Sequence, residues 1–194
     1  MKRIMAFLLA LCLGLALGVP ALAETEPADG MEAALQTITS HVKDVLEIDD
    51  DYTDFTGSYN DGLRPGWYLY WSDDGRDLSV TCDEDGVVTD VYFWQNSGRW
   101  DRFYGFDAAF PALEEAEAQS QAETWLARLM GEGETARIDG HTVGLTRDGA
   151  YRFYGVVLMN GLESPVTFNL YLDQNGLSSY NRSDSYTGYV GGVP

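Results

Sequence analysis

One pattern occurs twice along this chain, and it limits the fold more than any other feature: a helix-like segment followed by short strand-like segments. The first helix-like segment runs from Met31 to the acidic residues 49–51, and the second runs from Pro111 to Gly131. In both, the apolar residues recur mostly every three or four positions, as on one face of a helix. They are Leu35, Ile38, Val42, Val45 and Leu46 in the first segment and Ala122, Trp125, Leu126, Leu129 and Met130 in the second. The sequence therefore predicts two amphipathic helices.

Each predicted helix is followed by four segments of strand-like composition. After the first helix these are residues 52–59, 67–72, 78–82 and 87–94; after the second they are residues 136–146, 150–159, 165–173 and 176–182. Gly, Asn and Asp stand between them, for example in Asp73-Asp74-Gly75 and Asn160-Gly161, and these residues supply the positive φ angles of tight turns. The order of helix, strands, helix and strands predicts an α+β fold.

The two halves also match position by position. An offset of 84 aligns the apolar residues of the helices, and an offset of 90 aligns one strand of each half. The aligned strand residues are Leu78, Val80 and Cys82 with Phe168, Leu170 and Leu172. Because side chains alternate between the two faces of a strand, matched positions share a face. Two interpretations are open: an internal duplication, which we expect, and a chance similarity of two amphipathic hairpins.

The N-terminus has the features of a secretion signal. Lys2 and Arg3 form a basic start, residues 4–19 are almost entirely apolar, and Ala21-Leu22-Ala23 places small residues where a signal peptidase reads them. The apolar run is short for a membrane-spanning helix, and the polar residues 24–26 follow it directly. We expect cleavage after Ala23, secretion, and no stable membrane insertion of the mature chain.

The chain is strongly acidic. The sequence has 12 Lys+Arg against 31 Asp+Glu, a formal net charge of −19, and loss of Lys2 and Arg3 with the signal makes it −21. This field repels nucleic acids and anionic membranes, so neither is an expected partner. Aromatic residues make up 13% of the sequence, which is enough for a folded core despite the charge. Cys12 lies in the signal and Cys82 is the other cysteine, so no internal disulfide is expected.

Part of this pattern resembles a known family. The residues that carry the resemblance are Glu115-Ala116 with Ala122, Trp125 and Leu126 on the second helix, and the strand-turn sequences Asp83-Glu84-Asp85-Gly86 and Asp173-Gln174-Asn175-Gly176. They resemble the PepSY-type unit and, more narrowly, the tandem YcdB/YcdC repeat of secreted proteins from Gram-positive bacteria. The match spans about residues 31–186. Its Asp-x-x-Gly motif is common in hairpins, because Asp caps the turn and Gly takes a positive φ.

The resemblance implies a fold class, domain boundaries and a role. The fold would be α+β, with two tandem PepSY-like units, each a helix followed by an antiparallel β-sheet. The expected boundaries are a signal peptide at residues 1–23, a leader at 24–30, a first repeat with its connector at 31–107, a second repeat at 108–186 and a flexible tail at 187–194. A non-catalytic role outside the cytoplasm is also implied, since related units occur in protease propeptides and are thought to restrain peptidases.

The candidate nucleophiles and metal ligands lack supporting motifs. Ser40 and Lys43 match the Ser-x-x-Lys motif of penicillin-binding enzymes, but the companion Lys-Thr-Gly and Ser-Asp-Asn motifs are missing. Cys82 falls on the core-facing positions of its strand, so we expect a buried thiol. His41 and His141 have no cysteine nearby and would need carboxylates from distant segments to bind zinc. We expect no catalytic residue, no metal site and no cofactor.

The acidic clusters suggest other chemistry. Residues 49–51 with Asp54 are similar to a calcium loop, yet the sixth and twelfth positions from the start hold Asp54 and Asn60, where an EF-hand has Gly and Glu. The clusters at residues 73–77 and 83–85 fall in predicted hairpin turns, where Asp is favoured locally. We expect solvated turns at these places. The sequence leaves open a pair of catalytic carboxylates like those of glycosidases, because spacing along the chain does not reveal the distance between two carboxylates in the fold.

Aromatic residues are concentrated in two strand-like segments. Residues 67–71 place large rings on both faces of one strand, and residues 92–94 do the same on another. One face can pack against the helix. The other is either exposed, which would suit peptide or sugar recognition, or covered as the interface between the two repeats, which is the interpretation we favour. We expect the connector to hold the two units against each other through five further aromatic side chains: Trp100, Phe103, Tyr104, Phe106 and Phe110.

The sequence therefore predicts a non-catalytic secreted binding or peptidase-regulating module of the cell envelope or extracellular space. The expected partner is a peptidase or another extracellular protein or peptide. The alternative is a secreted hydrolase that acts on polymer substrates through paired carboxylates. A cleft with two facing carboxylates would favour the hydrolase, whereas a continuous exposed aromatic patch or a free sheet edge would favour binding.

Overall fold

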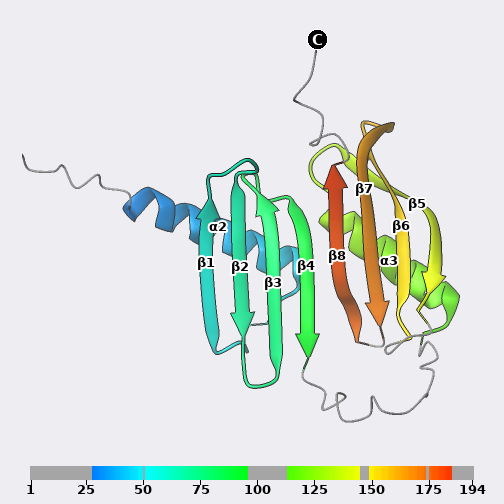
Figure 1. Ribbon diagram of the computed structural model, residues 1–194, viewed down its shortest axis with the longest axis horizontal. Helices are drawn as coiled ribbons and strands as arrows, with labels where there is room; N and C mark the ends of the chain where they lie inside the picture. The colour runs from blue at the N-terminus through cyan, green and yellow to red at the C-terminus, as the bar shows by residue number, and fades with distance from the viewer. Residues whose placement is uncertain (1–27, 50, 96–112, 145–148, 174, 185–194) are drawn as a thin grey trace, which may run out of the picture. The chain divides into compact units, whose positions relative to one another are not determined.

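Two helices and eight strands form the part of the chain that the computed structural model describes, which is residues 28–49, 51–95, 113–144, 149–173 and 175–184 (Figure 1). By its contacts the chain divides into Met1–Ala33 and Ala34–Pro194, and all the strands belong to the second part. The expected signal peptide, the expected tail and the five aromatic residues of the connector lie outside the described residues.

The elements follow the order helix, four strands, helix, four strands. The first half contains α2 (Ala28–Leu46), β1 (Asp54–Asn60), β2 (Gly66–Ser72), β3 (Arg76–Asp83) and β4 (Val88–Gln95). The second half contains α3 (Glu115–Leu129), β5 (Glu134–Val143), β6 (Tyr151–Met159), β7 (Leu162–Asp173) and β8 (Gly176–Asp184). The predicted helices and strands are confirmed in position, with ends that differ by a few residues. The helix α2 begins at Ala28, inside the segment expected to be a leader.

All eight described strands belong to one antiparallel sheet, in the order β1-β2-β3-β4-β8-β7-β6-β5 (Figure 1). The last strands of the two halves, β4 and β8, pair at the centre of this sheet. Their register places Asp90 opposite Asn181, Val91 opposite Tyr180 and Tyr92 opposite Ser179.

This topology contradicts the expected fold class. The described chain is mostly β, with one continuous sheet and two helices, and it does not form two tandem units that each have a helix and a sheet of their own. The physical reason lies at the edges of the meanders. Each half ends on a strand with unpaired backbone N–H and C=O groups, and pairing β4 with β8 satisfies both edges at once.

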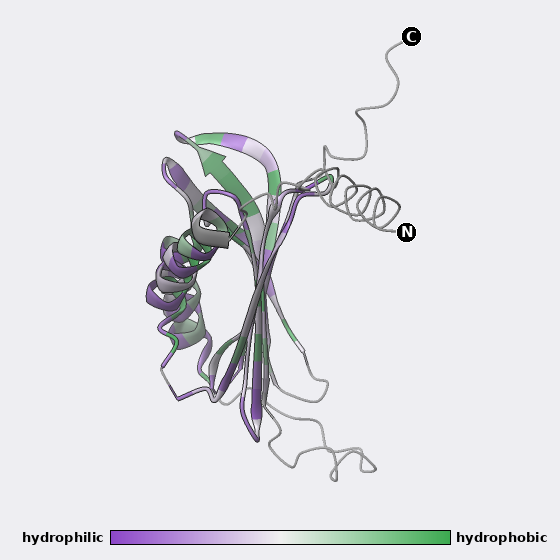
Figure 2. Cartoon of the chain, turned by 90° about the vertical axis from the view of Figure 1, so that its left-hand side faces the viewer, coloured by the Kyte–Doolittle hydropathy of each residue, from purple (hydrophilic) through white to green (hydrophobic). Residues whose placement is uncertain are grey.

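Both helices cover the same face of the sheet, where apolar side chains form a common core (Figure 2). From α2 this core takes Val42 and Leu46, and from α3 it takes Ala118, Ala122, Leu126 and Leu129. The strands contribute every second residue, as the alternating burial along β2, β3 and β6 shows. Neither described helix combines the length and the apolar composition needed to cross a membrane.

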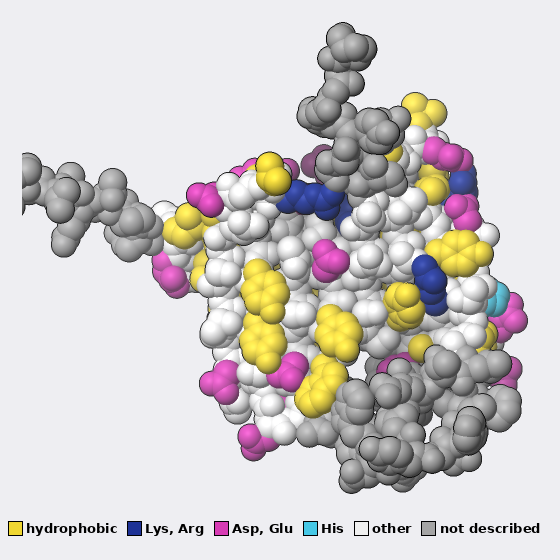
Figure 3. Space-filling model, viewed as in Figure 1, with side chains coloured by type: hydrophobic (Ala, Val, Ile, Leu, Met, Phe, Trp, Pro, Cys, Tyr) yellow, Lys and Arg dark blue, Asp and Glu magenta, His cyan; other side chains and the backbone are white. Residues whose placement is uncertain are grey.

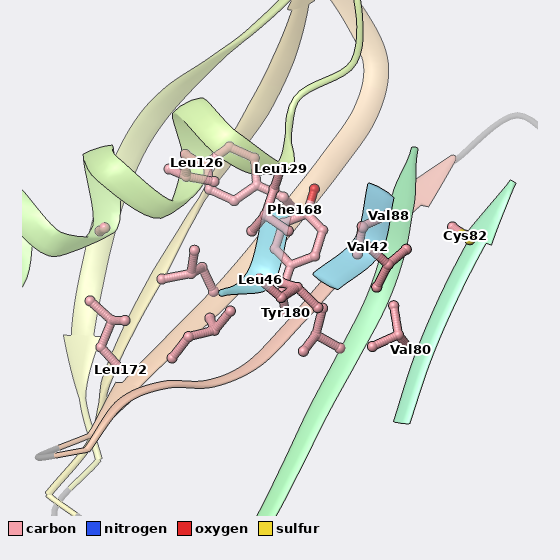
Figure 4. Close-up of a cluster of buried hydrophobic side chains, with 14 of the residues drawn as sticks. Val42, Leu46, Val80, Cys82, Val88, Leu126, Leu129, Phe168, Leu172 and Tyr180 are labelled. Atoms are coloured by element: carbon pink, nitrogen blue, oxygen red, sulfur yellow. The ribbon is translucent and has the colours of Figure 1, made fainter. Parts of the chain in front are cut away.

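The core spans the junction of the two halves. Figure 4 shows Val80, Cys82 and Val88 from the first half with Phe168, Leu172 and Tyr180 from the second, gathered in one cluster with residues of both helices. Burial of this apolar surface contributes about 25 cal/mol per Å². A shared core is a further reason why the halves form one sheet.

Aspartates close three of the hairpin turns. The Asp73 carboxylate accepts hydrogen bonds from the backbone N–H groups of Gly75 (3.0 Å) and Arg76 (2.8 Å), and these bonds together with the Arg76 guanidinium lower its pKa. Asp83 accepts from Asp85 (3.1 Å) and Val87 (2.9 Å) in the same way. The Asp173 carboxylate accepts from the N–H of Asn175 at 2.7 Å. The interpretation of these Asp-rich segments as turns is confirmed for Asp73, Asp83 and Asp173, whereas Asp77, which was expected in the first turn, lies in β3.

Candidate binding surface

The face of the sheet opposite the helices carries exposed aromatic side chains. Trp67 and Trp71 on β2 point toward the helices and are 5% and 2% exposed. Leu69 lies on the same buried side, whereas Tyr68 and Tyr70 have the opposite orientation, because side chains alternate along a strand. Tyr68 is accordingly 45% exposed, and Tyr92 on β4 is 57% exposed.

Four aromatic residues of the first half define this surface, which we call the aromatic face: Tyr68 and Tyr70 on β2, and Tyr92 and Trp94 on β4. Strand β3 runs between them and presents the small residues Ser79 and Thr81 on the same side. Figure 3 shows hydrophobic side chains (yellow) gathered over β2 and β4, with a strip of uncharged polar side chains and backbone (white) between them. The rings therefore flank a strip of small polar side chains.

The register extends this arrangement across the sheet. One row of directly opposite residues runs through Thr56, Tyr70, Ser79, Tyr92, Ser179, Tyr171 and Arg152. Tyrosines occupy every second strand of this row from β2 to β7, and serines lie between them. With neighbouring strands about 4.8 Å apart, successive tyrosines are about 10 Å apart. The row crosses the junction between β4 and β8, so it depends on the continuity of the sheet.

Hydrogen bonds fix several of these side chains. The Tyr70 hydroxyl donates to Asp77 Oδ1 at 2.6 Å, and this bond raises the pKa of Tyr70. Arg152 donates from Nε (3.0 Å) and from a terminal nitrogen (2.7 Å) to Asn169 Oδ1, and its guanidinium carbon lies 5.8 Å from the centre of the Tyr171 ring. Asp90 stands beside Thr81 and Asn181, and desolvation by its surroundings raises its pKa. The aromatic face thus presents rings held on rigid strands, with hydrogen-bond donors and acceptors between the rings.

The interpretation of these rings as the interface between two repeats is wrong. The two halves join edge to edge through β4 and β8, so their faces do not pack on each other. Tyr68 and Tyr92 stay exposed to solvent among the described residues. Of the two alternatives drawn from the sequence, the exposed patch is the one that the structure has.

The candidate nucleophiles and metal ligands lie apart from one another. Cys82 is 1% exposed in the core, which confirms its predicted burial, and desolvation raises the pKa of its thiol to about 12. Ser40 and His41 are exposed on α2. His141 on β5 lies 3.5 Å from the Glu115 carboxylate, and its ring is tilted against the rings of Tyr151 and Phe153 at centroid distances of 5.9 and 5.5 Å. Within the described ranges, no three His, Cys, Asp or Glu side chains come together as a metal-binding group.

A groove lies between α3 and β5, and the sequence does not predict it. This groove has a volume of about 530 Å³. Its apolar lining comes from Leu126, Ala127 and Met130 of α3 and from Ala136 and Ile138 of β5. No local pattern in the sequence predicts this groove, because it depends on how α3 lies beside β5.

A solved structure with a similar fold is the C-terminal domain of Bacillus megaterium YpeB. It matches this chain with a TM-score of 0.53 and 10% sequence identity, over 82% of this chain and 67% of the YpeB domain. No family model and no curated protein matches the sequence. The similarity supports a PepSY-like fold. At this identity it concerns the fold alone, and the narrower resemblance to tandem YcdB/YcdC repeats stays a prediction.

Proposed function

We propose that this chain is a non-catalytic binding module that acts outside the cytoplasm and contacts a peptidase or another extracellular protein through its aromatic face. One observation carries the proposal: Tyr68, Tyr70, Tyr92 and Trp94 lie on the same open side of a sheet whose other side is covered by helices. The extracellular location rests on the signal sequence expected at residues 1–23. The PepSY-like fold supports a regulatory or binding role.

The aromatic face has the properties of a protein-binding surface. Tyr and Trp are enriched at protein interfaces, because each ring buries a large area and loses little conformational entropy. The strands β2 and β4 hold these rings at fixed spacing, and the hydrogen bond from Tyr70 to Asp77 restricts one of them further. A partner that covered the face would remove the apolar edges of the rings from water while Ser79 and Thr81 kept polar partners.

Three of the carboxylates hold the fold together through their contacts. Asp73 and Asp83 accept backbone hydrogen bonds in turns, and Glu134 is paired with Arg182. These contacts support a scaffold role for the acidic residues. The hydrolase acting through paired carboxylates stays an alternative from the sequence alone.

The proposal is tested by capture and by inhibition with matched variants. The chain is collected from the medium of an expressing host and is used to capture proteins from the secreted fraction of its own source. A double variant, Tyr68→Ser with Tyr92→Ser, removes the two most exposed rings of the aromatic face. The control, Leu63→Ser, removes a fully exposed apolar side chain from the loop between β1 and β2, outside that face.

We expect a defined protein to be retained by the native chain and by Leu63→Ser, and retention to fall at least tenfold with the double variant. If that protein is a peptidase, adding the native chain should slow its hydrolysis of casein, and the double variant should not. Equal retention by all three chains, or retention of nothing, would contradict the proposal.

A further inference from the structure

We propose that the groove between α3 and β5 binds an extended basic peptide, which adds to the sheet as a further antiparallel or parallel strand beside β5. This site lies at the opposite end of the strand order from β2, and it does not depend on the aromatic face. The inference rests on three observations: an unpaired strand edge, an apolar groove beside that edge and an excess of acidic groups around it.

The first observation is the edge. In the described sheet β5 is the last strand of the order and pairs with β6 alone. The backbone N–H and C=O groups on its outer side can therefore bond to an added strand. A register shift between Ile138 and Gly140 interrupts regular pairing, so the regular edge is the five-residue stretch Glu134–Ile138. The same five residues form the strand side of the groove.

The second observation is the groove itself. Ala136 and Ile138 point to the helix side of the sheet but are only partly buried, because α3 covers β7 as well as β5 and leaves the outer margin of β5 open. An added strand would place every second side chain on this same side, next to Leu126 and Met130 of α3. The volume of about 530 Å³ has room for apolar side chains from such a strand. The groove therefore fits a peptide in which apolar residues alternate.

The third observation is charge. Around the groove and the edge stand the acidic residues Glu123, Glu134, Asp139 and Glu163, against the basic residues Arg137 and Arg182. Arg137 is already paired with Asp139 and Glu163, and Arg182 is paired with Glu134. The exposed carboxylate of Glu123 accepts a hydrogen bond from the neutral side-chain amide of Gln119 at 2.8 Å. The local excess of negative charge favours a basic peptide, and Asp139 and Glu163, which contact Arg137 on the outward side of β5, favour Lys and Arg on that side.

The charge of the whole chain also decides between two occupants. A second copy could pair edge to edge along β5, but each copy carries a net charge of −19, so the two would repel. A basic peptide is attracted by the same field. We therefore assign the groove to a basic peptide with alternating apolar residues.

The test uses three fluorescent eight-residue peptides and the full chain. Acetyl-(Lys-Val)4-amide has the proposed charge and alternation. The (Glu-Val)4 peptide reverses the charge, and the (Lys-Pro)4 peptide keeps the charge but lacks every second N–H donor, so it cannot complete a strand ladder. Fluorescence anisotropy measures binding. We expect the Lys-Val peptide to bind at least tenfold more tightly than either of the other two.

A pair of variants on α3 locates the site. Ala127 is exposed and lines the groove, so Ala127→Trp fills it; Ala116 is exposed on the same helix outside the groove, so Ala116→Trp is the matched control. Affinity for the Lys-Val peptide should fall at least tenfold with Ala127→Trp and stay within twofold with Ala116→Trp. Hydrogen exchange should show new protection of the amides of residues 134–138 when the peptide is bound, in the native chain and in the control alike.

Three results would overturn the proposal. One is equal binding of all three peptides. Another is loss of Lys-Val binding with Tyr68→Ser and Tyr92→Ser while Ala127→Trp still binds, which would place the peptide on the aromatic face. The third is self-association of the chain, detected by sedimentation, with protection of residues 134–138 in the absence of peptide; this would assign the edge to a second copy. Since the aromatic-face variants leave the groove intact, failure here is distinct from failure of the proposed function.

Discussion

At the scale of single residues, Cys82 has the chemistry of a nucleophile and the position of a core residue. Its side chain is 1% exposed, and it stands opposite Trp67 on β2 and Val88 on β4. Desolvation raises the pKa of its thiol to about 12. A thiol reacts as the thiolate, so at neutral pH this group is almost entirely unreactive. Its place on the strand determines its role, which is packing.

We therefore expect Cys82 to resist thiol reagents in the folded protein. In a chain with Cys12→Ser, a chromogenic disulfide reagent at mildly alkaline pH should release no colour until guanidinium chloride unfolds the protein, and then one equivalent. Rapid reaction under native conditions would show that Cys82 is accessible.

Glu134 and Arg182 form a largely buried ion pair on the helix side of the sheet. Two guanidinium nitrogens of Arg182 donate to the two carboxylate oxygens at 2.8 and 2.9 Å, and the N–H of Gly131 donates to the same carboxylate at 2.8 Å. The exposed fractions of the two side chains are 13% for Arg182 and 9% for Glu134. The hydrogen bonds from Arg182 and from Gly131 lower the pKa of Glu134, despite the opposing effect of desolvation.

Replacing this carboxylate should cost stability in a pH-dependent way. We expect Glu134→Gln to lower the free energy of unfolding by about 1.5–3 kcal/mol at neutral pH. Because the folded pKa of Glu134 is depressed, its stabilisation is complete above the unfolded value of about 4.3 and is lost as pH falls through the folded pKa. Urea unfolding at several pH values should show the difference between the two chains shrinking in acid.

The matched control is Glu163→Gln. Glu163 is 62% exposed and pairs with Arg137 at the surface, so its loss should change stability little at any pH. A deficit of Glu134→Gln that persists unchanged in strong acid would mean that the charge of Glu134 is not the cause.

At the scale of secondary structure, the sequence locates the elements well because their signals are local. Both helices were expected from their apolar spacing, and all eight described strands were expected from alternation and from the Gly, Asn and Asp residues between them. The turn at Asn160-Gly161 is an example: both residues have positive φ, 52° and 81°. Such signals act over a few residues, so a local pattern is enough to find them.

Gly155 shows a constraint that such patterns do not reveal. It lies in the middle of β6, and a Cβ at this position would stand 1.9 Å from the carbonyl oxygen of Arg137 on β5 and 2.9 Å from the Phe168 ring on β7. The strand β6 can therefore approach both neighbours closely only because this residue has no side chain.

We expect Gly155→Ala to lower the free energy of unfolding by about 2–3 kcal/mol, because the backbone of β5 has to move. The control is Gly75→Ala in the turn between β2 and β3, where an added Cβ would meet no atom within 4 Å, so its effect should be small. Thermal unfolding followed by circular dichroism measures both variants, and equal stability of the two would contradict the close approach of β5 and β6.

At the scale of the whole molecule, the sequence shows which face of a strand is buried, but it does not show which strands pair with each other. Alternation on β3 identified the core side of Cys82, but nothing in a local pattern says that β4 pairs with β8, about 90 residues away. For the same reason the sequence favours an interface between repeats for the aromatic residues, whereas the structure leaves Tyr68 and Tyr92 exposed. The groove beside β5 was missed because it depends on where α3 lies over the sheet.

The expected internal duplication stays a prediction, but the structure adds an observation relevant to it. The pairing register shifts between Thr81 and Cys82 in β3 and between Tyr171 and Leu172 in β7. These positions correspond under the offset of 90 residues. Irregularities of pairing at matched places are what a duplicated meander would preserve, even within one continuous sheet.

The aromatic row from Tyr70 through Tyr92 to Tyr171 exists only if the two halves share one sheet, so the pairing of β4 with β8 is the central claim. It is tested by a disulfide between Asp90→Cys and Asn181→Cys, which are directly opposite and exposed, in a chain with Cys12→Ser. Opposite residues of antiparallel strands lie within the Cα separation of about 4.4–6.8 Å that a disulfide needs.

The control pairs Asp90→Cys with Asn169→Cys, which lies on the same face one strand farther away, about 10 Å from β4. After mild oxidation, mass spectrometry of the monomer should find the bond between positions 90 and 181 and no bond in the control. Absence of the bond between positions 90 and 181, or its formation only between two chains, would contradict the single continuous sheet.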